Sequence, residues 1–238
     1  MTKKGNHKKN QDTILVNDKI LKEGFYYTES VSLKAFVSDG VGGLNSGEVA
    51  SEFVCRELKD TKNITEEAIK DINSRLVAFS DTAPEYSCMA TTLSGIVISE
   101  DISNIIHVGD SRISILEDGC LSPVTSDHTP STWVVSTTNP HRKKASTYRK
   151  LNTLLACMGG GDEKYADMLV FKNSQKTFED AERIIITTDG IHDFLEETEL
   201  EDLLTLKDCD LENIFSEIIN IATKNGSSDD KSIILIEK

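Results

Sequence analysis

Short apolar runs that each end at an aspartate are the feature that most constrains how this chain can fold. One run ends at Ser38-Asp39-Gly40, and the same pattern returns far downstream at Thr188-Asp189-Gly190. Carboxylates at the ends of β-like runs can converge at one edge of a sheet, where they repel one another unless a cation neutralises them. Gly40 has no Cβ, so its carbonyl could approach such an ion, although glycine-rich turns after strands are common. The pattern predicts a site for a pair of hard divalent ions.

Four more aspartates extend this pattern. Asp12 opens the first β-like run, Asp110 lies in a tight Gly-Asp-Ser bend, and Asp229 precedes the last β-like run. Asp110 and Asp229 could instead be ordinary turn residues. Asp193 lies one helical turn after Asp189, so it could face the same site or be a solvated or capping aspartate.

The composition limits the partners and the compartment that suit the chain. Its 238 residues fit one domain spanning 1–238, and its net charge of −14 argues against nucleic acid or an anionic membrane as a partner. No apolar segment follows the basic start, and no run is long enough to cross a membrane, so we expect a cytoplasmic protein, and a monomer. Five scattered cysteines without a CxxC pair argue against disulfides and zinc, and predict buried, reduced thiols.

Periodicity predicts strands and helices in alternating groups. The expected strands are Thr13–Val16, Phe25–Thr28, Leu33–Val37, Leu93–Ile98, Ile105–Val108, Ile113–Leu116, Met168–Phe171, Ile184–Ile186 and Ile233–Ile236. The expected helices are Gly47–Leu58, Thr65–Phe79, Thr198–Leu204 and Leu211–Lys224. Thr198 with Glu201 is expected to form a capping box, and Gly226 to end the last helix. This order predicts an α+β fold, a four-layer α/β/β/α sandwich with two central antiparallel β-sheets flanked by helices.

Seven short motifs, taken together and in order, resemble those of the metal-dependent type 2C Ser/Thr protein phosphatases, in their bacterial form. Any one of them is weak evidence, but the seven run through nearly the whole chain. They are Asn10-Gln11-Asp12, Ser38-Asp39-Gly40-Val41-Gly42-Gly43 with Gly47-Glu48-Val49-Ala50-Ser51, Met89-Ala90-Thr91-Thr92-Leu93, Val108-Gly109-Asp110-Ser111-Arg112, Thr125-Ser126-Asp127-His128, Thr188-Asp189-Gly190 and Gly226-Ser227-Ser228-Asp229-Asp230. The resemblance implies hydrolysis of phosphoserine or phosphothreonine on proteins, opposing a Ser/Thr kinase.

The resemblance also implies a centre of two Mn²⁺ or Mg²⁺ ions. Asp39 would bridge the ions, the carbonyl of Gly40 would bind one of them, and Asp189 and Asp229 would hold the other. Two such ions can activate a shared water for attack on phosphorus, so no cysteine or serine nucleophile is required. Oxygen ligands also select Mg²⁺ or Mn²⁺ over zinc.

Other positions match supporting roles in the same family. Gln11 and Asp12 match an amide and acid pair that holds metal-bound water, and Asp12 is therefore also a candidate metal residue. Asp110 and Asp193 match positions linked to a third, weaker ion in bacterial members.

Several positions depart from the family pattern, and His7 and Asp230 are the ones that bear most on the site. His7 stands where an arginine usually grips the substrate phosphate, so phosphate binding should be weaker and more pH-dependent. Lys8 or Lys9 could compensate, or could belong to a solvated basic terminus. Asp230 stands where an asparagine is usual, and its charge could tighten metal binding or point to solvent.

The interval of about 129–161 has weak periodicity and is predicted to be a loop insertion or flap. It contains Arg142, Lys143 and Lys144, the main basic patch beyond the N-terminus. This patch could dock an acidic phosphopeptide or form a solvated loop. His128 and His192 lie near predicted ligands, where they could support the site or pack in the core.

Two other functions remain open from the sequence. Because His7 replaces the arginine, the chain could be a weakly active module that binds phosphoproteins. The same ions would also serve a phosphoesterase of small metabolites.

Overall fold

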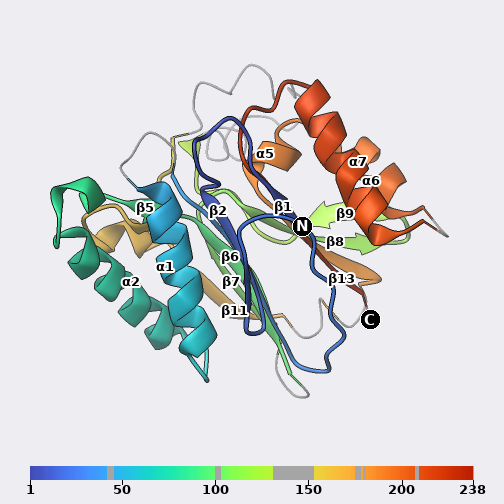
Figure 1. Ribbon diagram of the computed structural model, residues 1–238. Helices are drawn as coiled ribbons and strands as arrows, with labels where there is room; N and C mark the ends of the chain where they lie inside the picture. Colours follow the sequence, from blue (N-terminus) through green and yellow to red (C-terminus); the bar gives the residue numbers. More distant parts are fainter. Residues whose placement is uncertain are drawn as a thin grey trace.

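Two β-sheets lie at the centre of the computed structural model, and helices cover the outer face of each sheet (Figure 1). The structure describes residues 1–41, 46–99, 103–130, 153–174, 178, 181–206 and 209–237. Within these residues the α+β class and the four-layer α/β/β/α order agree with the sequence prediction.

The described strands pair antiparallel throughout. One sheet has the order β11-β7-β6-β4-β2-β3, the other has the order β1-β13-β12-β8-β9, and β10 pairs with β5. The strands are β1 Thr2–Lys3, β2 Asp12–Val16, β3 Lys19–Leu21, β4 Leu33–Asp39, β5 Ala90–Thr91, β6 Leu93–Ile98, β7 Ser103–Val108, β8 Arg112–Glu117, β9 Cys120–Pro123, β10 Met158–Gly159, β11 Val170–Asn173, β12 Arg183–Thr187 and β13 Lys231–Glu237.

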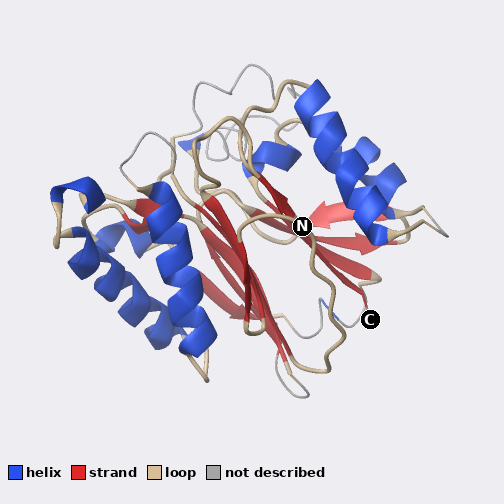
Figure 2. Cartoon of the chain, in the orientation of Figure 1, coloured by secondary structure: helices blue, strands red, loops and turns tan. Residues whose placement is uncertain are grey.

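The helices form the two outer layers, as the blue elements in Figure 2 show. Helices α1 and α2 pack on the six-stranded sheet, and α6 and α7 pack on the five-stranded sheet. The described helices are α1 Gly47–Asp60, α2 Glu66–Ser80, α5 Asp189–His192, α6 Glu197–Leu204 and α7 Leu211–Lys224, with 3₁₀ turns at Pro84–Tyr86 and Glu163–Ala166.

Neighbouring strand residues serve different cores, because successive side chains point to opposite faces of a sheet. On β2, Ile14 packs between the sheets, whereas Leu15 packs under α1 and α2. Val37 and Phe36 divide in the same way on β4. On β12, Ile185 packs against the helices of the other outer layer. Strands buried on both faces therefore read as continuous apolar runs in the sequence.

Most predicted elements are present with ends shifted by a few residues. The predicted helix from Thr65 is α2, and the Thr65 side chain caps it by accepting a hydrogen bond from the Ala68 N–H at 3.2 Å. Gly226, the predicted helix end, follows the end of α7 with φ of 99°.

The predicted strand Phe25–Thr28 is wrong. The chain leaves the sheet after Gly24, whose backbone bonds with Thr2. Phe25 then packs edge-on against Phe215, with ring centroids 6.0 Å apart, while Tyr27 is 60% exposed. Aromatic residues favour strands only where a neighbouring strand accepts them, and the described chain offers none here.

The predicted capping box of Thr198 and Glu201 is also wrong. Helix α6 begins earlier, and Glu196 and Glu199 form the reciprocal cap instead. The Glu201 carboxylate accepts a hydrogen bond from the Leu121 N–H at 2.7 Å. A run with several acids offers more than one helix start, and the tertiary contact of Glu201 selects among them.

The cysteine prediction holds in part, since all five thiols are free but only two of them are buried. Cys55 and Cys157 are buried, and burial raises the pKa of the Cys55 thiol to about 12 and that of the Cys157 thiol to about 11. Cys88, Cys120 and Cys209 are exposed.

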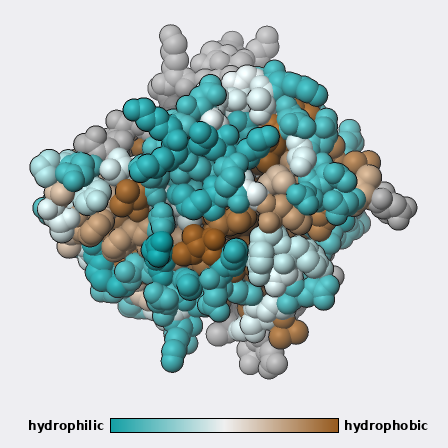
Figure 3. Space-filling view, viewed as in Figure 1, coloured by the Kyte–Doolittle hydropathy of each residue, from teal (hydrophilic) through white to brown (hydrophobic). Residues whose placement is uncertain are grey.

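A cavity of about 720 Å³ opens between the two sheets, away from the aspartates. Apolar side chains from β2, β4 and β13 line it, including Val16, Leu33 and Ile236. The face drawn in Figure 3 is mostly hydrophilic, with apolar atoms gathered toward its middle. Of the helices in the described part of the chain, none is long and apolar enough to span a membrane.

Candidate active site

The predicted site aspartates meet at one end of the sandwich. Asp12 begins β2 and Asp39 ends β4, and the two residues are directly paired across these strands. Asp189 begins α5 immediately after β12, and Asp229 lies just before β13, the neighbour of β12. Asp110 lies in the bend between β7 and β8. Antiparallel pairing thus brings acids from distant parts of the sequence to one edge.

Close packing explains why a glycine follows each of the two strand-end aspartates. A Cβ on Gly40 would overlap the backbone of Gly47 at the start of α1, and a Cβ on Gly190 would overlap the carbonyl of Asp230. Gly40 is also fixed by its N–H, which donates to the Gln11 carbonyl at 3.1 Å. The repeated Asp-Gly pattern therefore has a steric cause at both positions.

Two hydrogen bonds hold one of the two carboxylate oxygens of Asp12. Its Oδ2 accepts from the Ser232 hydroxyl at 2.6 Å and from the Thr188 hydroxyl at 3.1 Å. Thr92 similarly supports the Asp39 backbone, whose N–H donates to the Thr92 Oγ1 at 3.0 Å. Thr92 and Thr188 belong to two of the seven motifs, but the sequence did not predict that they support the aspartates. Ser232 lies outside the motifs, and no sequence pattern predicted its contact with Asp12.

The carboxyl groups of Asp12, Asp39 and Asp189 are buried together, and the charges that act on them most strongly within the described residues come from other aspartates. Burial, with the charges of Asp230 and Asp229, raises the pKa of Asp12 to about 7. Burial and then the surrounding aspartates, Asp12 first, raise the pKa of Asp39 well above its ordinary value. Burial and the nearby Asp110 and Asp229 do the same to the pKa of Asp189. These shifts identify an electrostatically unfavourable cluster of the kind that functional sites contain.

Buried acceptors without partners mark this same end. Within the described residues, the buried side-chain polar atoms without a hydrogen-bond partner are Gln11 Oε1, Asp12 Oδ1, Ser174 Oγ and Asp189 Oδ1. Three of these four oxygens, those of Gln11, Asp12 and Asp189, belong to predicted site residues. Unpaired buried carboxylate and amide oxygens are costly in a protein but are the ligands that Mg²⁺ and Mn²⁺ prefer. The residues present therefore fit the predicted divalent ions.

The adjacent aspartates of the last motif differ in their surroundings. The Asp229 side chain is 44% exposed, and its Oδ1 accepts from the Asp230 N–H at 2.8 Å. The Asp230 side chain is 1% exposed and accepts hydrogen bonds from the N-terminal segment. Asp230 therefore does not point to solvent.

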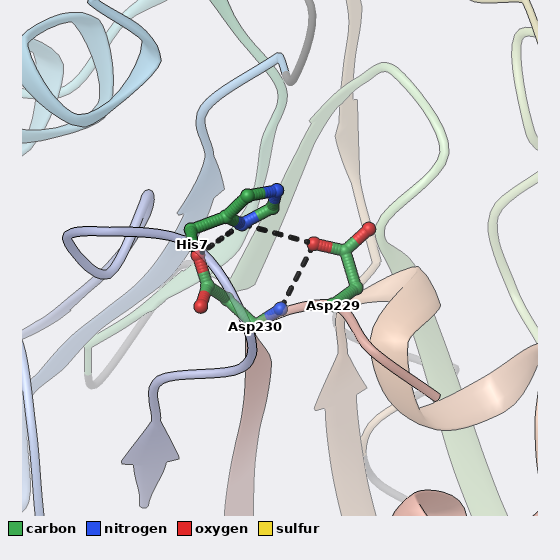
Figure 4. A group of neighbouring side chains, drawn as sticks. All are labelled: His7, Asp229 and Asp230. Atoms are coloured by element: carbon green, nitrogen blue, oxygen red, sulfur yellow. Dashed lines mark hydrogen bonds and ion pairs between the residues drawn. The ribbon is translucent and has the colours of Figure 1, made fainter. Parts of the chain in front are cut away.

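His7 lies beside these two aspartates (Figure 4). Its Nδ1 is 3.1 Å from Asp230 Oδ2 and 3.6 Å from Asp229 Oδ1, and its side chain is 38% exposed. The predicted phosphate-contact residue thus borders a predicted metal ligand. Lys9 is engaged elsewhere, because its Nζ pairs with Glu48 at 3.0 Å.

The two predicted third-ion residues lie near each other. Burial raises the pKa of Asp110 to about 7, and the charges of Asp127 and Asp193 contribute. Asp193 is the C-terminal cap of α5, and its N–H donates to the Asp189 carbonyl at 3.1 Å. Arg112 pairs with Asp127 at 2.6 Å, an interaction inside two recognised motifs that the sequence analysis did not single out.

The histidines near the predicted ligands have packing and hydrogen-bonding partners. His192 Nδ1 lies 2.9 Å from the Thr187 hydroxyl, and His128 Nδ1 accepts from the Gly109 N–H at 3.1 Å. His107, within β7, stacks at an angle on His128 with ring centroids 4.8 Å apart. Burial lowers the pKa of His107 to about 4.

The predicted flap is only partly described. Arg142, Lys143 and Lys144 lie outside the described residues, so their place relative to the site is not part of this structure. The described residues at the end of the interval include β10, which pairs with β5 and so is part of a small sheet rather than a loop.

Comparisons with known proteins agree with the geometry. The family model described as protein phosphatase 2C matches residues 7–232. The chain is 27% identical over 215 residues to the serine/threonine phosphatase stp of Listeria welshimeri, covering 85% of this chain and 83% of that protein. It is similar to the crystal structure of serine/threonine phosphatase Stp1 from Staphylococcus aureus, with a TM-score of 0.81, 26% identity, and coverage of 100% of this chain and 93% of that chain.

A more distant solved structure, the serine/threonine phosphatase PstP/Ppp of Mycobacterium tuberculosis, shares the fold, with a TM-score of 0.76 at 21% identity over 100% of this chain and 96% of that chain. The family model covers most of the chain, and the seven motifs recognised in the sequence lie along it. This chain therefore belongs to the protein phosphatase 2C family and is, as a member of it, a Ser/Thr protein phosphatase.

Proposed function

We propose that this phosphatase hydrolyses phosphoserine and phosphothreonine on proteins with the help of two Mn²⁺ or Mg²⁺ ions. Asp39, the carbonyl of Gly40, Asp189 and Asp229 would hold them. When bound, such ions lower the pKa of a shared water and so prepare it to attack phosphorus. The observation that carries the proposal is the pair of buried, unpartnered carboxylate oxygens, Asp12 Oδ1 and Asp189 Oδ1.

The residues of this chain divide the remaining work among them. Asp12 is held by Ser232 and Thr188 through one oxygen, which leaves its other oxygen and the Gln11 amide oxygen to accept hydrogen bonds from water. Because both of these oxygens are acceptors, they would orient a water by accepting its hydrogens, which would leave a lone pair of the water free to attack phosphorus. Asp110 and Asp193 would hold a third, weaker ion.

Phosphate recognition would fall to His7, whose ring borders Asp229 at the open side of the site. A single imidazole offers one hydrogen bond where a guanidinium offers two, so substrate affinity should be modest. Residues 1–238 would form one catalytic unit, with Arg142, Lys143 and Lys144 in a flap that contacts the protein substrate. The substrates would be phosphoproteins made by a Ser/Thr kinase.

The test is release of phosphate from a phosphothreonine peptide at increasing Mn²⁺ concentration. The parent should be active only with metal, and Asp39→Asn and Asp189→Asn should each be nearly inactive. Asp71→Asn, which removes an exposed carboxylate on α2, is the matched control and should behave as the parent. Unchanged activity in both site variants would overturn the assigned centre.

The same assay separates the other functions. A phosphorylated metabolite hydrolysed much faster than the peptide would point to a small-molecule phosphoesterase. Tight peptide binding in the presence of Mn²⁺ without release of phosphate would point to a binding module.

A further inference from the structure

The Asp230 carboxylate is a buried hub for the N-terminal segment. Its Oδ1 accepts from the Gly5 N–H at 2.6 Å, and its Oδ2 accepts from the Gln11 N–H at 2.7 Å and faces His7 Nδ1 at 3.1 Å. The Asn6 N–H adds a backbone bond to the Ser228 carbonyl at 2.8 Å. Residues 5–11 are thus fastened to the start of β13, next to the predicted ligand Asp229 (Figure 4).

These contacts make Asp230 a poor metal ligand. One oxygen each from Asp229 and Asp230 and one nitrogen of His7 lie within 4.8 Å of one another, a spacing that an ion could use. However, both oxygens of Asp230 already accept from N–H donors, and an ion in their place would leave those donors unpaired in a buried position. The geometry favours a fixed hydrogen-bonding group over a further ion site.

Two of the positions that depart from the family pattern are therefore in contact. His7 stands in place of an arginine and Asp230 in place of an asparagine, and the two side chains meet at 3.1 Å. A carboxylate accepts from Nδ1–H and so fixes the ring through one nitrogen, which leaves the Nε2 edge turned away from Asp230 (Figure 4). An asparagine could not accept from all three donors, because one of its two side-chain atoms is itself a donor.

We propose that His7 and Asp230 act as one coupled unit, in which Asp230 is the positioning residue that aims His7 at the substrate phosphate. The same carboxylate also sets the backbone of Gln11, and with it the start of β2 at Asp12. This proposal rests on the proposed function for the role of His7. Its claim about Gln11 and Asp12 extends to metal binding and can be tested without turnover.

The test is a double-mutant cycle on the full chain, made of Asp230→Asn, His7→Ala and both together. Each protein is assayed for kcat and KM on a phosphothreonine peptide and for direct Mn²⁺ binding by calorimetry. Asp230→Asn should raise KM about tenfold and weaken Mn²⁺ binding by up to about tenfold. A loss of about tenfold in metal affinity is at the lower end of what is lost when a residue that hydrogen-bonds to a metal ligand is replaced. In the His7→Ala background the same substitution should leave KM nearly unchanged, because Asp230 would affect phosphate binding through the His7 side chain, which that variant lacks.

A second pair of variants tests the coupling by placing an arginine at position 7, with and without the Asp230 carboxylate. His7→Arg alone should gain little, because the guanidinium would pair with the buried Asp230 carboxylate. His7→Arg combined with Asp230→Asn should bind the peptide more tightly than either single variant. The matched control is Asp71→Asn, which should leave KM, kcat and Mn²⁺ affinity unchanged.

Two results would overturn the proposal. One is a KM and an Mn²⁺ affinity equal to those of the parent in Asp230→Asn, measured where circular dichroism shows it folded. That would reduce Asp230 to a structural residue, with an effect on the melting temperature alone. The other is a KM effect of Asp230→Asn that persists in full in the His7→Ala background.

Failure of the proposed function gives a different outcome. If the parent binds Mn²⁺ without hydrolysing the peptide, the function fails, while a weaker Mn²⁺ affinity in Asp230→Asn would still support the positioning of the Gln11 segment. A parent that neither binds Mn²⁺ nor hydrolyses the peptide would overturn both.

Discussion

The two ends of the sandwich are built from the same strands but differ in what they bury. At one end β2 and β4 carry Asp12 and Asp39, whose carboxyl groups are buried and repel each other. At the other end the same two strands carry Val16 and Leu33, which line an apolar cavity. One end stores electrostatic repulsion, which a divalent cation can relieve, and the other has incomplete apolar packing. Of these two features, only the buried charge repulsion indicates which kind of ligand, a divalent cation, the site would bind.

The largest effect should come from the acidic end. Asp39→Asn should lower Mn²⁺-dependent activity by at least about 100-fold, because it removes a ligand from ions that supply several kcal/mol of transition-state stabilisation. The same substitution should raise the melting temperature of the metal-free protein, because it removes a buried, repelling charge. Phosphatase assays and thermal denaturation in EDTA measure the two effects. Retained activity, or a lower metal-free melting temperature, would contradict this account of the acidic end.

Adjacent residues on β2 sharpen the contrast in packing. Leu15 is fully buried under α1 and α2, so Leu15→Ala should cost about 2–5 kcal/mol of unfolding free energy. Val16 is partly exposed and lines the cavity, so Val16→Ala should cost less than about 1.5 kcal/mol. Urea denaturation measures both. Equal losses would mean that the apolar end is packed as tightly as the core beneath the helices.

The pH dependence of the metal-free protein gives a smaller effect with a defined sign. The pKa of Asp12 is about 7 when folded, above its unfolded value, so the folded state binds more protons and loses stability as pH rises toward 7. Replacing Asp12 with asparagine removes this penalty. The melting temperature of Asp12→Asn minus that of the parent, both in EDTA, should therefore increase between pH 5 and pH 8.

Subtracting the two melting temperatures cancels the opposite contribution of His107, a residue that both proteins contain and whose pKa burial lowers to about 4. A difference that stays constant or falls with pH would show that Asp12 is not held in a charge-repelling environment. Saturating Mn²⁺ should reverse the trend, because ionised carboxylates are the form that binds the ion.

The smallest effect should come from the exposed surface, which belongs to neither end. Arg56 and Glu52 pair at 2.6 Å across one turn of α1, with the Arg56 side chain largely exposed. Glu52→Gln should change the unfolding free energy by less than about 0.5 kcal/mol. A larger loss in urea denaturation would show that surface pairs contribute more to this fold than their exposure indicates.

The sequence predicted the sandwich because most of its strands are buried on two faces and its helices on one. Such runs are long enough to be recognised, and Leu33–Val37 and Ile184–Ile186 were placed within a few residues of β4 and β12. It failed at Phe25–Thr28, where a strand-forming composition pairs with no strand of the described chain. Pairing is a tertiary property, and no local pattern records it.

The site was predictable to the extent that its residues carry local signals. Asp39 and Asp189 stand beside glycines that packing requires, so the motif itself reflects the geometry. Asp229 and Asp230 are adjacent and chemically identical, yet one is half exposed and the other is a buried hub. Their difference depends on residues 5–11, which lie at the opposite end of the chain, and only the folded structure brings them together.

The most direct test of the central claim is a crystal structure of the protein grown with Mn²⁺, with anomalous differences recorded at the manganese edge. Two strong peaks should lie within coordination distance of Asp39, Asp189 and Asp229, with one of them also near the Gly40 carbonyl. Peaks absent from this end of the sandwich, with Asp12 Oδ1 and Asp189 Oδ1 still unpartnered, would contradict the account.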